Sequence, residues 1–89
     1  QQEQMTLLLK SAQKDFEKAI ALDTTYTKSY INLACVFDLL QNPEAAIGKI
    51  KELPIEQQKG VDAQRILAIA YYHADNEKKA EELWTELEK

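Results

Sequence analysis

The sequence predicts an all-α fold made of stacked helix pairs, and two observations lead to that prediction. The same residue types recur at one fixed spacing, the repeat step, most plainly from Ala12 to Ala46 and from Ala46 to Ala80. Six further registers keep this step: Phe16, Ile50 and Trp84; Ala19, Leu53 and Leu87; Tyr30 and Gln64; Leu33 and Leu67; Ala34 and Ala68; Phe37 and Tyr71. A fixed period of this length is typical of stacked helical repeats. In addition, apolar residues follow helical spacing, and no stretch alternates with the period of two that strands require.

Five helices are expected, over about residues 1–22, 27–40, 43–53, 61–74 and 76–88. The first is continuous because no Gly, Pro, Asn or Asp near Leu7–Leu9 could form a turn. Thr25 or Thr27 is the expected cap of the second helix. Asn42 should cap the third, with Pro43 in its first turn, where a missing N–H has no consequence.

The later part of the chain carries two further expected breaks. Pro54 ends the third helix, so residues 54–60 are predicted to form a linker. Asp75 or Asn76 is expected to cap the last helix. Ala34 and Ala68 are predicted to lie where paired helices cross, with large neighbours such as Phe37 filling the remaining space.

These registers resemble the tetratricopeptide repeat (TPR) family, whose pattern is W-x2-L-G-x2-Y, then A-x3-F, then P. The second unit reads Tyr30-x2-Leu33-Ala34-x2-Phe37 followed by Ala46-x3-Ile50. The third unit has the same order, but Gln64 replaces the aromatic residue at its start. The resemblance covers about two and a half units and implies a right-handed helical-repeat solenoid of antiparallel helix pairs.

The first unit keeps only its second half, so the chain divides into a partial unit and two fuller ones. We expect one domain over residues 1–89, with 1–26 as the second helix of a partial repeat, 27–60 as a full repeat and 61–89 as a full or terminal repeat. About three repeats are usually needed for stability. The sequence is therefore interpreted as a fragment of a longer chain or the end part of an array.

Composition excludes several classes of function. The net charge is −4, and residues 62–89 hold seven acids against four bases, which disfavours nucleic acid as a partner. The single cysteine rules out an internal disulfide. No apolar run approaches the length of a membrane span. The localisation of the protein stays open.

A pair of stripes offset from the core registers is the strongest candidate site. In the second unit Lys28, Ile31, Cys35 and Asp38 follow helical spacing, and the same slots of the third unit hold Asp62, Arg65, Ile69 and Tyr72. In the family that the chain resembles, this face lines a concave groove that binds an extended peptide or a partner's helix. Apolar members would contact the partner, while Lys28 and Arg65 could hold carboxylates. The alternative is that these residues pack against a neighbouring helix.

One subclass of the resembled family clamps the terminal carboxylate of heat-shock chaperones with Lys, Asn and Arg. Asn32 occupies the Asn slot of this clamp, and is therefore a further groove residue. Asp62 and Ile66, however, stand where the third unit should offer Lys and Arg. An acid at Asp62 would repel a carboxylate, so membership of this subclass is rejected.

Catalytic and metal sites are not expected. His73 and Cys35 could in principle form a dyad, but they belong to different units, and a histidine stabilised by the dipole of its helix end is the simpler interpretation. Glu82 and Glu86 lie one turn apart without a His or Cys beside them. Trp84 shares its register with Ile50, which predicts a packing role.

The sequence therefore predicts a non-catalytic module that binds a protein or peptide, without a cofactor. Two alternatives are a structural or oligomerisation segment of a larger array and an accessory domain of an enzyme. Leu7, Leu8 and Leu9 lack a partner helix, so a preceding repeat would cover them, or self-association through the N-terminal helix would do so.

Overall fold

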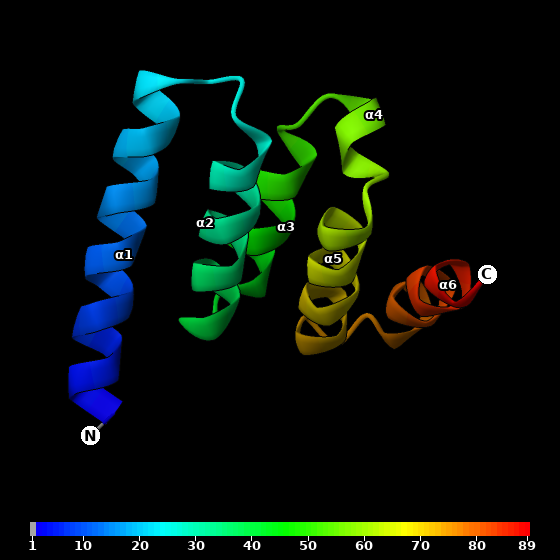
Figure 1. Cartoon of the computed structure of the whole chain (residues 1–89). Coiled ribbons are helices and arrows are strands. Elements are labelled where there is room, and N and C mark those ends of the chain that lie inside the picture. Colours follow the sequence, from blue (N-terminus) through cyan, green and yellow to red (C-terminus); the bar gives the residue numbers. More distant parts are fainter. Residues whose placement is uncertain (1) are drawn as a thin grey trace.

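A computed structural model describes residues 2–89 as an all-α fold (Figure 1). Six helices, and no strands, occur in this range. They are α1 (Gln2–Leu22), α2 (Thr27–Leu39), α3 (Pro43–Lys51), α4 (Ile55–Gln58), α5 (Val61–His73) and α6 (Glu77–Glu88). The five helices expected from the sequence are present, with ends within about two residues of those predicted. None of the described helices is both long and apolar enough to cross a membrane.

Helices that follow one another in the chain pack against one another. α1 packs on α2, α2 on α3, α3 on α5 and α5 on α6, while α2 also touches α5 directly. The four longer helices up to α5 lie side by side in Figure 1, whereas α6 is turned so that it is seen almost along its axis. The core lies between α2, α3 and α5. Its fully buried members are Leu33, Ala34, Ala46, Ile50, Ala63, Ala68 and Ala70.

The two turns within the helix pairs have the same geometry and are separated by one repeat step. Gln41 and Asp75 adopt left-handed backbone conformations, with φ of 65° and 64°. The N–H groups of Asn42 and Asn76 each donate, at 2.9 Å, to the carbonyl five residues earlier. This closes α2 and α5 with the hydrogen bond of a Schellman motif. The same asparagine side chains then accept from the N–H three residues on, at 3.3 Å, and cap α3 and α6 as predicted.

The connections between the pairs differ from the sequence predictions. The N-cap of α2 is Tyr26, which makes no side-chain cap bond, so the predicted cap at Thr25 or Thr27 is wrong. Thr25 instead donates to the carboxylate of Asp23 through its N–H at 3.0 Å and its hydroxyl at 2.6 Å. The predicted linker at 54–60 contains the one-turn helix α4, because Pro54 supplies an extended residue from which a new turn can start.

Gln64, which departs from the aromatic at the start of the repeat, has a defined structural role. In α2 the hydroxyl of Tyr30 donates to the carbonyl of Thr24, six residues earlier, at 3.0 Å. In α5 the amide of Gln64 donates to the carbonyl of Gln58, also six residues earlier, at 2.7 Å. Both side chains therefore tie the first helix of a pair to the connection before it. Gln64 thus takes the place of the aromatic residue in this contact and joins α5 to the end of α4.

Trp84 is the one large residue whose predicted packing is wrong. It is 39% exposed on α6, whereas Ile50 at the same register of α3 is fully buried. Ile50 belongs to the core cluster with Ala63 and Leu67 of α5. In residues 2–89 no further helix follows α6 to cover Trp84 in the same way.

A candidate interaction surface on α2 and α5

The two stripes predicted from the sequence are carried by α2 and α5, which touch each other. We call their residues the α2–α5 surface. Its members are Lys28, Ile31, Asn32, Cys35 and Asp38 on α2, and Asp62, Arg65, Ile69 and Tyr72 on α5. The stripes lie on neighbouring helices because α2 and α5 open successive pairs, with α3 packed against both.

The apolar residues of the α2–α5 surface range from half-buried to open. Ile31 is partly buried and packs against the core cluster, which agrees with the alternative interpretation as a packing residue. Cys35 and Ile69 are also partly buried. Tyr72 is 57% exposed near the C-terminal end of α5. Tyr72 is therefore the apolar member with the most surface left for a partner.

Apart from Asp38, the polar residues of the α2–α5 surface lie in the first half of each helix. Lys28, Asn32, Asp62 and Arg65 are all exposed. A guanidinium nitrogen of Arg65 lies 4.0 Å from a carboxylate oxygen of Asp62, one turn earlier in α5. Exposed pairs of this kind are worth little, so Arg65 can exchange Asp62 for a partner's acid at small cost.

Asp38 and His73 form a bond between α2 and α5 that sequence reasoning missed. Nδ1 of His73 lies 2.9 and 3.0 Å from the two carboxylate oxygens of Asp38. Because an ionised carboxylate only accepts, Nδ1 carries the proton and donates. The side chain of Asp38 is 9% exposed and that of His73 51%. Asp38 therefore joins the helix pairs rather than facing outward, and His73 has a specific partner beyond the helix dipole.

This bond also orders the exposed end of the α2–α5 surface. The rings of Tyr72 and His73 meet edge to face, with centroids 5.9 Å apart and planes at 61°. Asp38, Gln41, Pro43 and His73 line a small hollow of about 280 Å³ beside them. Asp38 is thus connected to Tyr72 through His73, which binds the carboxylate of Asp38 and contacts the ring of Tyr72.

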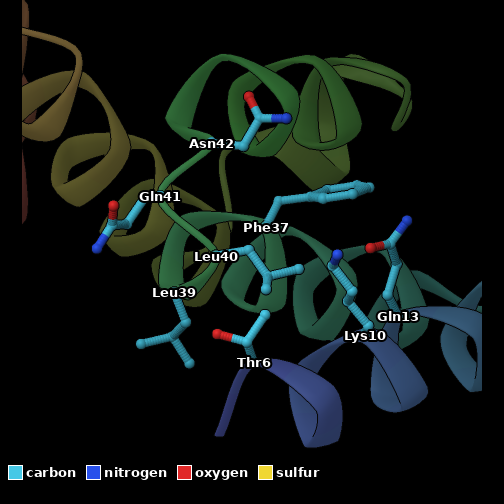
Figure 2. A pocket seen from close by; sticks show the side chains of 8 residues that line it. All are labelled: Thr6, Lys10, Gln13, Phe37, Leu39, Leu40, Gln41 and Asn42. Carbon is cyan, nitrogen blue, oxygen red and sulfur yellow. The ribbon is translucent and has the colours of Figure 1, made fainter. Parts of the chain in front are cut away.

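A second hollow lies outside the predicted surface, between α1 and the C-terminal end of α2 (Figure 2). Its volume is about 590 Å³. It is lined by Thr6, Lys10, Gln13, Phe37, Leu39, Leu40, Gln41 and Asn42. Figure 2 shows the ring of Phe37 and the side chains of Lys10 and Gln13 directed toward one another across it. Leu39 and Gln41 point away from this meeting point.

The described residues give no support to a nucleophilic or metal site. Within residues 2–89 no hydrogen bond joins Cys35 to His73, whose Nδ1 is engaged by Asp38. No group of three or more His, Cys, Asp or Glu side chains in the described part of the chain is placed to hold a metal ion. Glu82 and Glu86 are exposed and form one-turn contacts with Lys79 and Lys89.

Comparison with known proteins leaves the family of this chain open. The chain matches no protein-family model, no curated protein and no solved structure at a significant level.

Proposed function

We propose that this chain is a TPR-like array, a right-handed solenoid of antiparallel helix pairs, that serves as a protein-interaction module. The repeated turn geometry at Gln41 and Asp75 supports the array, because backbone conformation, closing bond and cap all recur with the repeat step. The fully buried Ala34 and Ala68 occupy the same place in their two helices and support it further. A stacked array exposes one continuous face that can bind an elongated ligand.

The observation that carries the interaction role is the exposed Tyr72 beside the half-buried Ile69. Aromatic residues that combine apolar area with a hydroxyl are frequent anchors of protein interfaces. The ring of Tyr72 also contacts the ring of His73 edge to face. A contact of this kind in the free chain would reduce the conformational entropy that Tyr72 loses when a partner binds.

The rest of the α2–α5 surface supplies a contact strip for a peptide or a helix. Cys35 and Ile69 would be the apolar floor, and Ile31 its edge against the core. Lys28, Asn32, Asp62 and Arg65 would set the register of the partner through charge and hydrogen bonds. Asp38 would not contact the partner and would contribute by binding His73 next to Tyr72.

The proposal is tested by selecting peptides from a random library on the immobilised chain and titrating them in solution. Amide shifts in ¹⁵N–¹H NMR spectra should concentrate on α2 and α5, including Cys35, Ile69 and Tyr72. Tyr72→Ala combined with Arg65→Glu should weaken binding by about tenfold or more. The matched control is Trp84→Ala with Lys78→Glu, which removes an exposed aromatic side chain and reverses one base on α6, a helix that carries no residue of this surface.

Two outcomes would refute the assignment of this surface. One is a selected peptide whose affinity falls equally in the test variant and in the control variant. The other is a set of amide shifts confined to α1 or α6. A label attached to Cys35, the only cysteine of the chain, gives an independent readout, because a bulky group there should block the same peptides.

A further inference from the structure

The open end of the α5–α6 pair contains a hollow that lies apart from the α2–α5 surface. It is lined by Lys59, Val61, Gln64, Glu86 and Leu87, and its volume is about 470 Å³. The end of α4, the start of α5 and the end of α6 contribute its walls. Figure 1 shows α6 turned away from α5, so that the two helices spread apart toward this end. A hollow of this size has room for one large side chain.

The corresponding end of the α2–α3 pair is closed by packed side chains. Tyr30 and Leu53 stand at the registers of Gln64 and Leu87, one repeat step earlier. Both belong to the core cluster, and they are 8% and 4% exposed. Gln64 and Leu87, by contrast, are only partly buried and line the hollow. The hollow therefore lies where the other pair contains a tyrosine ring.

The change from tyrosine to glutamine explains why this end stays open. A glutamine side chain is smaller than that of tyrosine, and the amide of Gln64 is held by the carbonyl of Gln58 at 2.7 Å. In the α2–α3 pair the connection that follows adds cover, because the amide of Gln58 donates to the carbonyls of Lys51 and Leu53. Within residues 2–89 no segment follows α6 to do the same. Space for an aromatic ring is thus left at this end of the pair.

The walls of the hollow are chemically suited to a tyrosine side chain. Val61 is 56% exposed, and together with Leu87 it offers apolar surface to a ring. Among the hydrogen bonds of residues 2–89, none engages the side-chain oxygen of Gln64, which can accept from a phenolic hydroxyl. An inserted tyrosine would combine ring burial with a hydrogen bond. Tyr30 does the same within the chain when its hydroxyl donates to the carbonyl of Thr24.

The charges on the rim of the hollow indicate that this tyrosine belongs to a peptide. Lys59 lies on one side of the hollow and Glu86 on α6 lies on the other. Each forms an exposed ion pair with a residue three positions away, Lys59 with Glu56 at 3.6 Å and Glu86 with Lys89 at 3.3 Å. Exposed pairs of this kind are weak, so a partner's charges can replace them at little cost. The rim therefore complements a peptide that carries an acid and a base next to its tyrosine.

We propose that this hollow is a second binding site, which takes the tyrosine side chain of a partner peptide that has one acidic and one basic neighbour. The ring packs between Val61 and Leu87, and its hydroxyl donates to Gln64. The partner thus fills from outside the place that Tyr30 fills in the other pair. The site shares no residue with the α2–α5 surface and does not depend on the function proposed for that surface. A single aromatic anchor of this kind gives an expected dissociation constant of about 0.1–1 mM.

Titration with two blocked tripeptides tests this site. They are acetyl-Lys-Tyr-Glu-amide and acetyl-Glu-Tyr-Lys-amide, which present the two charges in both orders. Methyl ¹H–¹³C NMR spectra report binding directly, because Val61 and Leu87 carry methyl groups on the walls of the hollow. At least one tripeptide should shift these signals and approach saturation by about 5 mM. Alanine in place of its tyrosine should weaken binding by about tenfold or more, and phenylalanine by about threefold.

Filling the hollow from within gives the sharper result. Gln64→Tyr restores the residue type of the other pair, so it should weaken tripeptide binding by about tenfold or more while the melting temperature does not fall. Gln4→Tyr, the same replacement at an exposed position of α1, should bind like the wild type. Val61→Asp places an acid at the first position of α5, where the helix dipole favours it, and should weaken binding by about fivefold or more in a folded chain. Tyr72→Ala should leave binding unchanged.

Several results would overturn the proposal. One is a set of Val61 and Leu87 methyl signals that no tripeptide moves, and another is an alanine tripeptide that binds as tightly as the tyrosine one. Wild-type affinity in Gln64→Tyr would also refute it, and if that variant lost its fold, wild-type affinity in Val61→Asp would do so. Loss of binding in Tyr72→Ala would assign the tripeptides to the α2–α5 surface instead. Methyl signals that shift with protein concentration in the absence of peptide would assign the hollow to a second copy of the chain.

Discussion

The two complete helix pairs, α2–α3 and α5–α6, carry the same residue types at the same registers but bury them differently. Ile50 of α3 is fully buried, whereas Trp84 of α6 is 39% exposed. The reason is the number of neighbours, because α3 lies against both α2 and α5 while α6 packs on α5. A register thus determines which side of a helix is apolar, and the neighbouring helix determines how much that side stabilises the fold.

Replacing the side chain at this shared register by alanine should have the largest effect on the free energy of unfolding. The size of this effect should differ between the two pairs. Ile50→Ala removes a fully buried side chain between three helices and should lower the free energy of unfolding by about 3–4 kcal/mol. Trp84→Ala removes a larger side chain that is 39% exposed and lacks a second neighbouring helix, so it should lower the free energy of unfolding by less, about 2 kcal/mol. Urea unfolding of both variants, followed by circular dichroism, measures the difference.

The test depends on which of the two substitutions, Ile50→Ala or Trp84→Ala, lowers the free energy of unfolding more. If Trp84→Ala destabilised the chain as much as Ile50→Ala, α6 would have to be packed on both sides in solution. Leu87→Ala is a useful companion variant, since Leu87 is also on α6 but only partly exposed. Its effect should fall between the other two.

The bond between Asp38 and His73 links the two pairs and should give an intermediate effect. In a double-mutant cycle, Asp38→Ala and His73→Ala should each destabilise the chain, with a coupling energy of about 1 kcal/mol between them. The coupling arises because the nearly buried carboxylate has His73 as its donor at 2.9 Å. Additive effects of the two substitutions would show that this contact does not form in solution.

Much of this architecture was predictable from the sequence, because local chemistry and the repeat step act together. Asn42 was recognisable as a cap because Pro43 follows it in the first turn of a helix, and Asn76 was one of the two caps expected for the last helix. The continuous α1 followed from the lack of a turn residue. Burial at the alanine registers followed from the repeat step, and holds for Ala34, Ala46, Ala68 and Ala80.

Most of the features that the sequence did not reveal are contacts between residues that lie far apart in the chain. Nothing local relates Asp38 to His73, which are 35 residues apart and meet only because α2 and α5 touch. The half-burial of Ile31 likewise depends on the core beneath it. α4 was missed because four residues carry too little periodicity to distinguish a turn of helix from a loop. Gln64 could have been a signal, since a polar residue at an aromatic register needs a partner.

The matched turns at Gln41 and Asp75 offer a smaller effect of opposite sign. Both residues have positive φ, a conformation that glycine adopts without strain. Gln41→Gly should raise the free energy of unfolding by about 0.5–1 kcal/mol. Asp75→Gly should raise it less, because aspartate tolerates this conformation better than glutamine does. Thermal unfolding of the two variants compares the turns, and a destabilised Gln41→Gly would contradict the inferred strain.

The connections that lead into the two pairs should differ in their response to acid, which is the smallest effect expected. The hydroxyl of Thr25, and then its backbone N–H, donate to Asp23 and lower the pKa of this carboxyl below its ordinary value. A lowered pKa in the folded state means that the stabilisation is present above the unfolded-state pKa of about 3.9 and is lost as pH falls through the folded-state pKa. The connection into α5 relies instead on the amides of Gln58 and Gln64, which do not titrate.

Melting temperatures of wild type and Thr25→Val should therefore differ at about pH 7 and converge toward about pH 2. The control variant Thr24→Val should keep the melting temperature of the wild type at every pH. A gap between wild type and Thr25→Val that stayed constant down to the lowest pH would mean that the hydroxyl of Thr25 stabilises the turn without acting through the charge of Asp23.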